Sequence, residues 1–81
     1  MKVHLKIVCQ SLLSPLESGV YELSTGANTQ DLLDAAIKRH GSPDPRALEF
    51  LLFFIDSSQA SAQTELKPDA QVMITKAFTG G

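Results

Sequence analysis

Val72-Met73-Ile74-Thr75-Lys76-Ala77-Phe78-Thr79-Gly80-Gly81 closes the sequence and joins an alternating segment to a pair of glycines. Val72, Ile74 and Lys76 alternate with Met73, Thr75 and Ala77, which is the pattern of a half-buried β-strand. A glycine pair does not stabilise the end of a strand, because glycine loses more conformational freedom on ordering than any other residue. We therefore predict a final strand followed by a flexible C-terminal tail at residues 78–81.

The glycine pair has two interpretations at this point. Gly80 and Gly81 carry no Cβ, so they form a slim end that can enter a narrow channel and offer a terminal carboxylate to the active site of another protein. The alternative is a frayed end or a remnant of cloning, and the pair alone does not exclude it.

The N-terminal part of the chain predicts two more strands. Residues 1–9 alternate, with apolar side chains at Val3, Leu5 and Ile7 and polar ones between them. Residues 11–19 contain Ser14-Pro15 and Ser18-Gly19, which break regular structure. We therefore expect a hairpin whose second strand covers residues 20–23.

Residues 29–40 predict the main helix. Leu32, Leu33, Ala36 and Ile37 repeat at helical spacing, and polar residues occupy the other side. Asn28 or Thr29 can cap the first turn, Asp31 lies near the positive end of the helix dipole, and basic residues lie near the negative end. Gly41 suits a left-handed C′ position, and Pro43 prevents continuation of the helix.

The second half of the chain predicts a buried strand and two connections. Asp44-Pro45 can start one short turn through residues 46–49. The apolar run 50–55 favours a strand that is buried on both faces. Residues 56–63 are expected to form a loop, and residues 67–70 a tight turn before the last strand. Within these elements we expect Leu33, Ile37, Phe53 and Ile74 to be core residues.

The order strand, strand, helix, strand, strand predicts the topology. The first and last strands are both long and half polar, so they most economically lie side by side and parallel, with the helix crossing one face. That is a β-grasp (ubiquitin-like) arrangement in the α+β class, with a mixed sheet of four to five strands. We expect residues 1–81 to form a single domain whose last strand is central.

Composition excludes several classes of function. The 43% hydrophobic content supports a packed core, and the net charge of −2 without a cluster of basic residues argues against nucleic-acid binding. One cysteine, Cys9, forms neither an internal disulfide nor a cysteine-based zinc site and is typical of a reducing compartment. No apolar run suggests a signal peptide or a membrane span. We expect a cytoplasmic protein without a membrane partner.

The segment from Leu66 to Gly81 carries a specific pattern: a leucine, a tight turn at Pro68-Asp69-Ala70-Gln71, a hydrophobic strand and a closing Thr79-Gly80-Gly81. This pattern resembles the small sulfur-carrier proteins of the ubiquitin-like superfamily (MoaD/ThiS type), nearest to the molybdopterin synthase small subunit (MoaD). Asp69 replaces the family's turn glycine, and aspartate tolerates the left-handed backbone. The usual acidic charge is absent at Ala70 and Gln71, and Lys76-Ala77 replaces a common Pro-Pro, which indicates a specialised relative with its own partner.

The resemblance implies a carrier rather than an enzyme. An E1-like adenylating enzyme of the MoeB/ThiF type would use ATP to convert the Gly81 carboxylate to an acyl-adenylate, and sulfur transfer would leave a thiocarboxylate. Gly80 and Thr79 would present this end, and a large subunit such as the molybdopterin synthase catalytic subunit would accept the sulfur. The same reading predicts no catalytic residue, no metal and no stably bound cofactor in this chain.

The other candidate residues have alternative interpretations. Phe78 and Lys76 are possible partner-docking residues, although Phe78 can instead pack back onto the sheet. Cys9 can be imagined as a sulfur relay, but a small buried or edge thiol is the simpler interpretation. His4 and His40 are explained as a surface residue and a helix-dipole partner.

Two other functions stay open on the sequence. One is a ubiquitin-like modifier that is conjugated to lysines of target proteins through Gly81, and the other is a plain binding module with a coincidental tail. The receiving pathway is also open, because thiamine, amino-acid and tRNA thiolation use carriers with this ending as well as molybdopterin synthesis.

Overall fold

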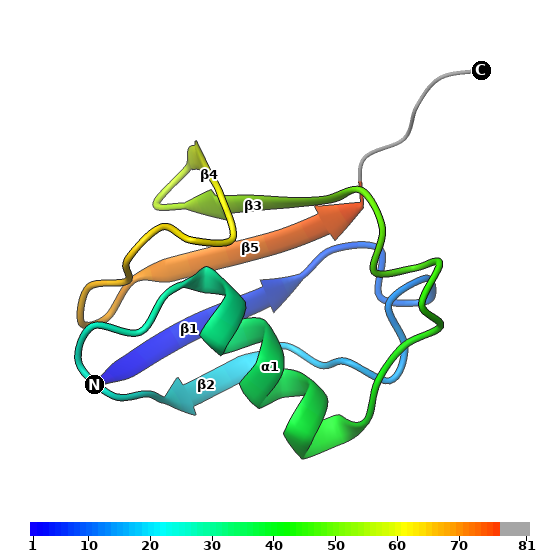
Figure 1. Ribbon diagram of the computed structural model, residues 1–81, viewed down its shortest axis with the longest axis horizontal. Coiled ribbons are helices and arrows are strands. Elements are labelled where there is room, and N and C mark those ends of the chain that lie inside the picture. Colours follow the sequence, from blue (N-terminus) through cyan, green and yellow to red (C-terminus); the bar gives the residue numbers. More distant parts are fainter. Residues whose placement is uncertain (77–81) are drawn as a thin grey trace.

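The described residues form a mixed five-stranded sheet with one helix on one face (Figure 1). The computed structural model describes residues 1–76. Its elements are, in chain order, β1 (Lys2–Ile7), β2 (Gly19–Glu22), α1 (Thr29–His40), β3 (Leu51–Ile55), β4 (Ser58–Ala60) and β5 (Gln71–Lys76).

The strands are ordered β2-β1-β5-β3-β4, so the last strand lies in the centre. β5 is parallel to β1, with Leu5 opposite Val72 and Ile7 opposite Ile74. β5 is antiparallel to β3, and β1 is antiparallel to β2. The predicted β-grasp arrangement, with parallel terminal strands and a crossing helix, is confirmed.

The helix has the predicted bounds, and its ends show why. The Asn28 side chain accepts a hydrogen bond from the Asp31 amide, and the Asp31 carboxylate accepts one from the Asn28 amide, both at 2.9 Å. This reciprocal capping box satisfies two amides that the helix itself cannot pair. At the other end the Gly41 amide donates to the Ile37 carbonyl. Gly41 has φ 103° and ψ 164° rather than the predicted left-handed α conformation, and this extended region is open almost only to glycine.

The start of α1 is also fastened to the chain before β5. The amides of Thr29 and Gln30 donate to the carbonyls of Thr64 and Ala62, and the Leu66 amide donates to Ala27. The fully buried Thr29 hydroxyl donates to the same Thr64 carbonyl. These bonds set where the crossing helix begins relative to the segment that leads into the central strand.

The core lies between the sheet and α1, and it contains residues that the sequence analysis assigned to a loop. Leu13 and Leu16 are fully buried, although they lie in the irregular segment between β1 and β2. Leu33, Phe53 and Ile74 are buried as predicted, whereas Ile37 is only half-buried. The segment between β1 and β2 therefore closes the end of the core that the single helix leaves open.

The expectation that residues 50–55 are buried on both faces is wrong. Within this run only Phe53 is buried; Leu52 and Phe54 are half-buried, and Phe50 is 65% exposed. Strand alternation points Phe53 toward α1 and its two neighbours toward the opposite face. Because the one helix covers one face, the apolar run is shared between the core and an open sheet surface.

Two turns use a backbone conformation that the sequence pattern signals only in part. Asp56 and Ser57 have φ values of 49° and 73° between paired Ile55 and Ser58, as a two-residue hairpin of type I′ requires. This hairpin forms β4 inside the segment that was expected to be a loop. Asp69 has φ 63°, so the left-handed turn position predicted for it is confirmed.

Truncation of the central strand tests the core. Ile74→Ala is expected to lower the free energy of unfolding by about 3 kcal/mol, because it empties a fully buried site between β1 and β3. Ile37→Ala, at a half-buried site, should cost less than half as much. Urea denaturation of both variants measures the difference, and equal losses would contradict this placement of the core.

Candidate functional site

The end of β5 is the part of the described chain that comes closest in sequence to the predicted reacting residue, Gly81. Lys76 is the last described residue and the last residue of β5. The predictions for Phe78, Thr79, Gly80 and Gly81, and for a flexible tail at 78–81, lie outside the described residues. What the structure gives is the surface from which these five residues, 77–81, continue.

Lys76 fastens the strand end to the short turn before β3. Its Nζ donates to the carbonyl oxygens of Arg46 at 2.8 Å, Glu49 at 3.0 Å and Ala47 at 3.4 Å. An ammonium has three donor hydrogens and no acceptor, so this arrangement uses its full capacity. The predicted partner-docking role of Lys76 stays a prediction, and in the described chain its charge is engaged by the turn.

The turn itself follows the sequence prediction. The Asp44 carboxylate accepts from the Arg46 amide at 2.8 Å, and the amides of Ala47, Leu48 and Glu49 each donate to the carbonyl three residues earlier. Ala47 is buried, which anchors the turn to the core. The turn is not followed by another helical turn whose amides could donate to its last carbonyls. The Lys76 ammonium donates to the Glu49 carbonyl instead.

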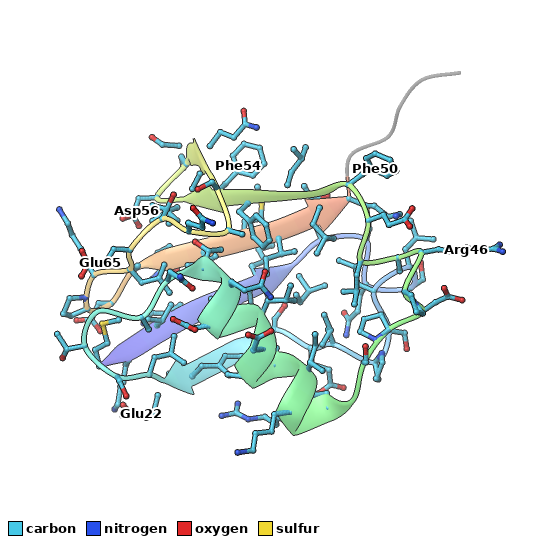
Figure 2. All side chains as sticks on the ribbon, viewed as in Figure 1. Glu22, Arg46, Phe50, Phe54, Asp56 and Glu65 are labelled. Carbon is cyan, nitrogen blue, oxygen red and sulfur yellow. The ribbon has the colours of Figure 1, made fainter. Side chains whose placement is uncertain are left out.

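Phe50 stands at the end of this turn, directly before β3. Its side chain is 65% exposed and its backbone has φ 57°. The next residue, Leu51, is paired with Lys76 across the β3–β5 ladder. Figure 2 shows the Phe50 ring beside the end of β5. Nothing in the sequence separates Phe50 from the apolar run that it begins, so the sequence analysis assigned it to the buried strand.

The structure brings Cys9 to the same edge of the sheet but keeps both histidines away from it. The Cys9 thiol is half-buried and lies 3.8 Å from the Thr75 hydroxyl. His4 is half-buried on β1, opposite Gln71 at the start of β5. His40 lies at the end of α1, with its Nδ1 3.9 Å from the Glu17 carboxylate.

The open face of the sheet carries a shallow hollow of about 470 Å³. Lys6, Met73 and Phe54 lie side by side in its floor, because the strand register places them in one row across β1, β5 and β3. Figure 2 shows Phe54 on the side of the sheet away from α1. A second hollow of about 290 Å³ lies beside the β3–β4 hairpin.

Residues 1–76 show no cluster of side chains that could hold a metal ion. No three histidine, cysteine, aspartate or glutamate side chains of this part of the chain gather around a common point. Among the same residues, every buried side-chain nitrogen or oxygen has a hydrogen-bond partner. No helix of the described chain has the length and apolar character needed to cross a bilayer.

Tyr21 is the one described residue with a clear pKa shift. Burial raises the pKa of its hydroxyl, and the nearby Arg39 guanidinium opposes this rise. Arg39 lies 4.1 Å from the ring centre, and the hydroxyl donates to the Glu17 carbonyl. Because the neutral form is favoured and both the ring face and the hydroxyl are engaged, Tyr21 is a core residue that also bonds to the loop before β2.

Solved structures match 95% or more of the chain. SAMP1 from Haloferax volcanii superposes with a TM-score of 0.79 at 12% identity over 100% of both chains. The chain has the ubiquitin-like β-grasp fold. A second structure of H. volcanii small archaeal modifier protein 1 gives a TM-score of 0.73 at 10% identity, over 95% of this chain and 98% of that one.

A third similar structure connects the fold to the sequence resemblance. It is a protein of Pyrococcus furiosus that is provisionally named molybdopterin converting factor, subunit 1, with a TM-score of 0.72, 21% identity and coverage of 96% and 99%. No family model matches the sequence, and no curated protein matches it. The shared property is therefore the fold.

Removal of the Lys76 ammonium tests its structural role. Lys76→Met keeps most of the apolar stem but removes the donor to three carbonyls, of which Arg46 alone keeps a second bond, from the Glu49 amide. We expect a loss of about 1 to 2 kcal/mol in the free energy of unfolding, in the range of hydrogen bonds to a charged group at a partly exposed site. Urea denaturation measures the loss, and Lys67→Met, at an exposed lysine in the turn before β5, is the control. Equal stability of the two variants would contradict the role of Lys76 in fastening the turn.

Proposed function

We propose that this chain is a sulfur carrier whose Gly81 carboxylate is adenylated and converted to a thiocarboxylate. The observation that carries the proposal is the position of β5. β5 is the central strand and ends with Lys76. The sequence then reaches Thr79-Gly80-Gly81 within five further residues. The likeness of the fold to a molybdopterin converting factor subunit supports the same interpretation.

The chemistry needs a partner, because a carboxylate is a poor electrophile. One carboxylate oxygen of Gly81 attacks the α-phosphate of ATP, and pyrophosphate leaves. A hydrosulfide-level nucleophile then attacks the acyl carbon and displaces AMP, which leaves a C–S bond in place of a C–O bond. A side chain at residue 80 or 81 would obstruct this end in the partner's channel, whereas glycine leaves room.

In this proposal the chain supplies the carrier atom and its partners supply catalysis. An E1-like adenylating enzyme of the MoeB/ThiF type would bind ATP and activate Gly81. A larger subunit, such as the molybdopterin synthase catalytic subunit, would accept the sulfur. The chain itself would be neither an enzyme nor the holder of a cofactor, and it would act in the cytoplasm, where ATP is available.

We assign the sulfur to molybdopterin synthesis as the first pathway to test. The pattern from Leu66 to Gly81 and the converting-factor likeness both favour it over thiamine, amino-acid or tRNA thiolation. Reconstitution with a molybdopterin synthase large subunit is the direct test. Conversion of the pterin precursor by the thiocarboxylate form, and not by the carboxylate form, is the expected result.

A protein modifier is the second candidate, and a specific observation favours it. Both H. volcanii structures that match the fold are of a small archaeal modifier protein. Intact mass of the protein from its source cells distinguishes the two functions. A carrier gains the mass difference between sulfur and oxygen, whereas a modifier is recovered as conjugates with a Gly81-to-lysine isopeptide bond.

Changes at the reacting end should separate function from folding. Deletion of Gly81, or addition of one residue after it, is expected to abolish ATP-dependent adenylation, because the reacting carboxylate is then displaced from the partner's active site. Gly80→Val should fail through steric exclusion. Tm should stay at the wild-type value in all three, because the described core is built from residues 1–76.

Intact mass also measures sulfur loading of the control variant and of a protein extended after Gly81. Cys9→Ser should load sulfur like the wild type, because the thiol is not part of the proposed reaction. Loading is measured as the Gly81 adenylate or thiocarboxylate after incubation with the adenylating enzyme, ATP and hydrosulfide. Full loading of an extended protein that still carries its extension would refute the carrier proposal.

A further inference from the structure

Phe50, close to the end of β5, combines an exposed aromatic ring with an unfavourable backbone conformation. Phe50 is 65% exposed and has φ 57°. For a bulky residue a positive φ is a genuine outlier, since the Cβ then crowds the backbone. Neither burial nor backbone preference explains a phenylalanine at this position, and strained residues that persist gather at functional sites.

The surroundings of Phe50 hold it next to the strand end. On one side of it, the Glu49 carbonyl accepts a hydrogen bond of 3.0 Å from the Lys76 ammonium. On the other side, Leu51 is paired with Lys76 in the β3–β5 ladder. The turn is further fixed by the Asp44–Arg46 bond and by buried Ala47. The ring is therefore presented from a fixed backbone beside the end of β5 (Figure 2).

The length of chain after Lys76 limits where a partner can lie. Five residues separate Lys76 from Gly81, and a fully extended chain of that length spans at most about 18 Å. Two packed layers of protein are separated by about 10 Å. A partner that encloses Gly81 in an active site therefore has to bring its own surface against the residues around the end of β5. Among residues 1–76, Phe50 is the most exposed of the large apolar residues, and it directly precedes the partner of Lys76 on β3.

We propose that Phe50 is the anchor with which this protein docks onto its adenylating partner, in an apolar pocket beside the entrance for the tail. This inference rests on the proposed function. A second copy of this chain is the other possible occupant, and sedimentation of the free protein tests it. Exposed aromatic residues that fill a partner's pocket contribute a large share of the binding energy in protein interfaces.

The backbone of Phe50 makes a sharp experiment possible. Phe50→Gly and Phe50→Asn both remove the ring and suit a positive φ, so their Tm should equal or exceed that of the wild type. Phe50→Tyr keeps a ring. Val20→Thr is the matched control, because Val20 is also an exposed apolar residue, 47% accessible, but lies on the edge strand β2.

The assay is adenylation of the full-length chain by the E1-like enzyme of the source organism, with carrier concentration varied at saturating ATP. We expect Phe50→Gly and Phe50→Asn to raise KM for the carrier at least about tenfold, with kcat within about twofold of the wild type, because a docking contact contributes binding rather than chemistry. Phe50→Tyr and Val20→Thr should keep the wild-type KM.

Each other result overturns the inference. Wild-type KM in the Gly and Asn variants would remove Phe50 from the interface and leave the carrier proposal intact. A Tm well below that of the wild type in both variants would show that the ring stabilises the fold instead. Self-association that is lost in Phe50→Gly would assign the ring to a second copy. Failure of the wild-type protein to be adenylated at all would overturn the proposed function together with this inference.

Discussion

The parallel pairing of β1 with β5 is the constraint on which the rest of the structure depends. Antiparallel neighbours can be joined by a tight turn, but parallel strands require a long crossover, which here contains β2, α1 and the β3–β4 hairpin. The ladder is extended at both ends by the bonds from His4 to Ala70 and from Val8 to Ile74. Because the two strands run the same way, their ends meet at one edge of the sheet, where Lys76 and the turn of residues 44–50 also lie.

A sheet covered by one helix has two faces with different roles. Val3, Leu5, Val72 and Ile74 point toward α1 and are buried, whereas the residues between them on the same strands point to the open side. The apolar content of β3 is divided in the same way, so Leu52 and Phe54 stay half-buried beside Met73 and Lys6. A fold of this size therefore exposes apolar surface without losing its core, and that surface is available for contact with other molecules.

The sequence predicted best where a local interaction determines the structure. The bounds of α1 follow from the Asn28–Asp31 capping box at its start and from Gly41 at its end, and the left-handed turn follows from Asp69. The positions of the central strand and of its parallel neighbour followed from strand length and alternation. The helix and turn signals lie within a few residues of the features that they specify, whereas the pairing of β1 with β5 was inferred from the similar length and polarity of two distant strands.

The sequence was a poor guide to burial where burial depends on distant parts of the chain. Leu13 and Leu16 carry no periodic pattern, and only the three-dimensional position of their loop buries them. The run 50–55 is continuous and apolar, so its pattern could not show that a single helix covers one face of β3. Asp56-Ser57 is a weaker hairpin signal than Asn-Gly, and the short β4 was therefore missed. Phe50, the proposed docking residue, falls in this second group, since exposure is a property of the whole fold.

The bonds of Lys76 explain how Phe50 keeps its strained backbone conformation beside the end of β5. The turn of residues 44–50 ends in carbonyl groups that would otherwise need water, and it ends in a phenylalanine whose backbone conformation is unfavourable. A strained conformation survives only when its surroundings over-determine it. Three bonds from one ammonium, together with the pairing of Leu51 with Lys76, provide that restraint. The residue from which the chain continues toward Gly81 thus also fixes the surface around that point, so the orientation of the strand end and the position of Phe50 are set by the same set of bonds.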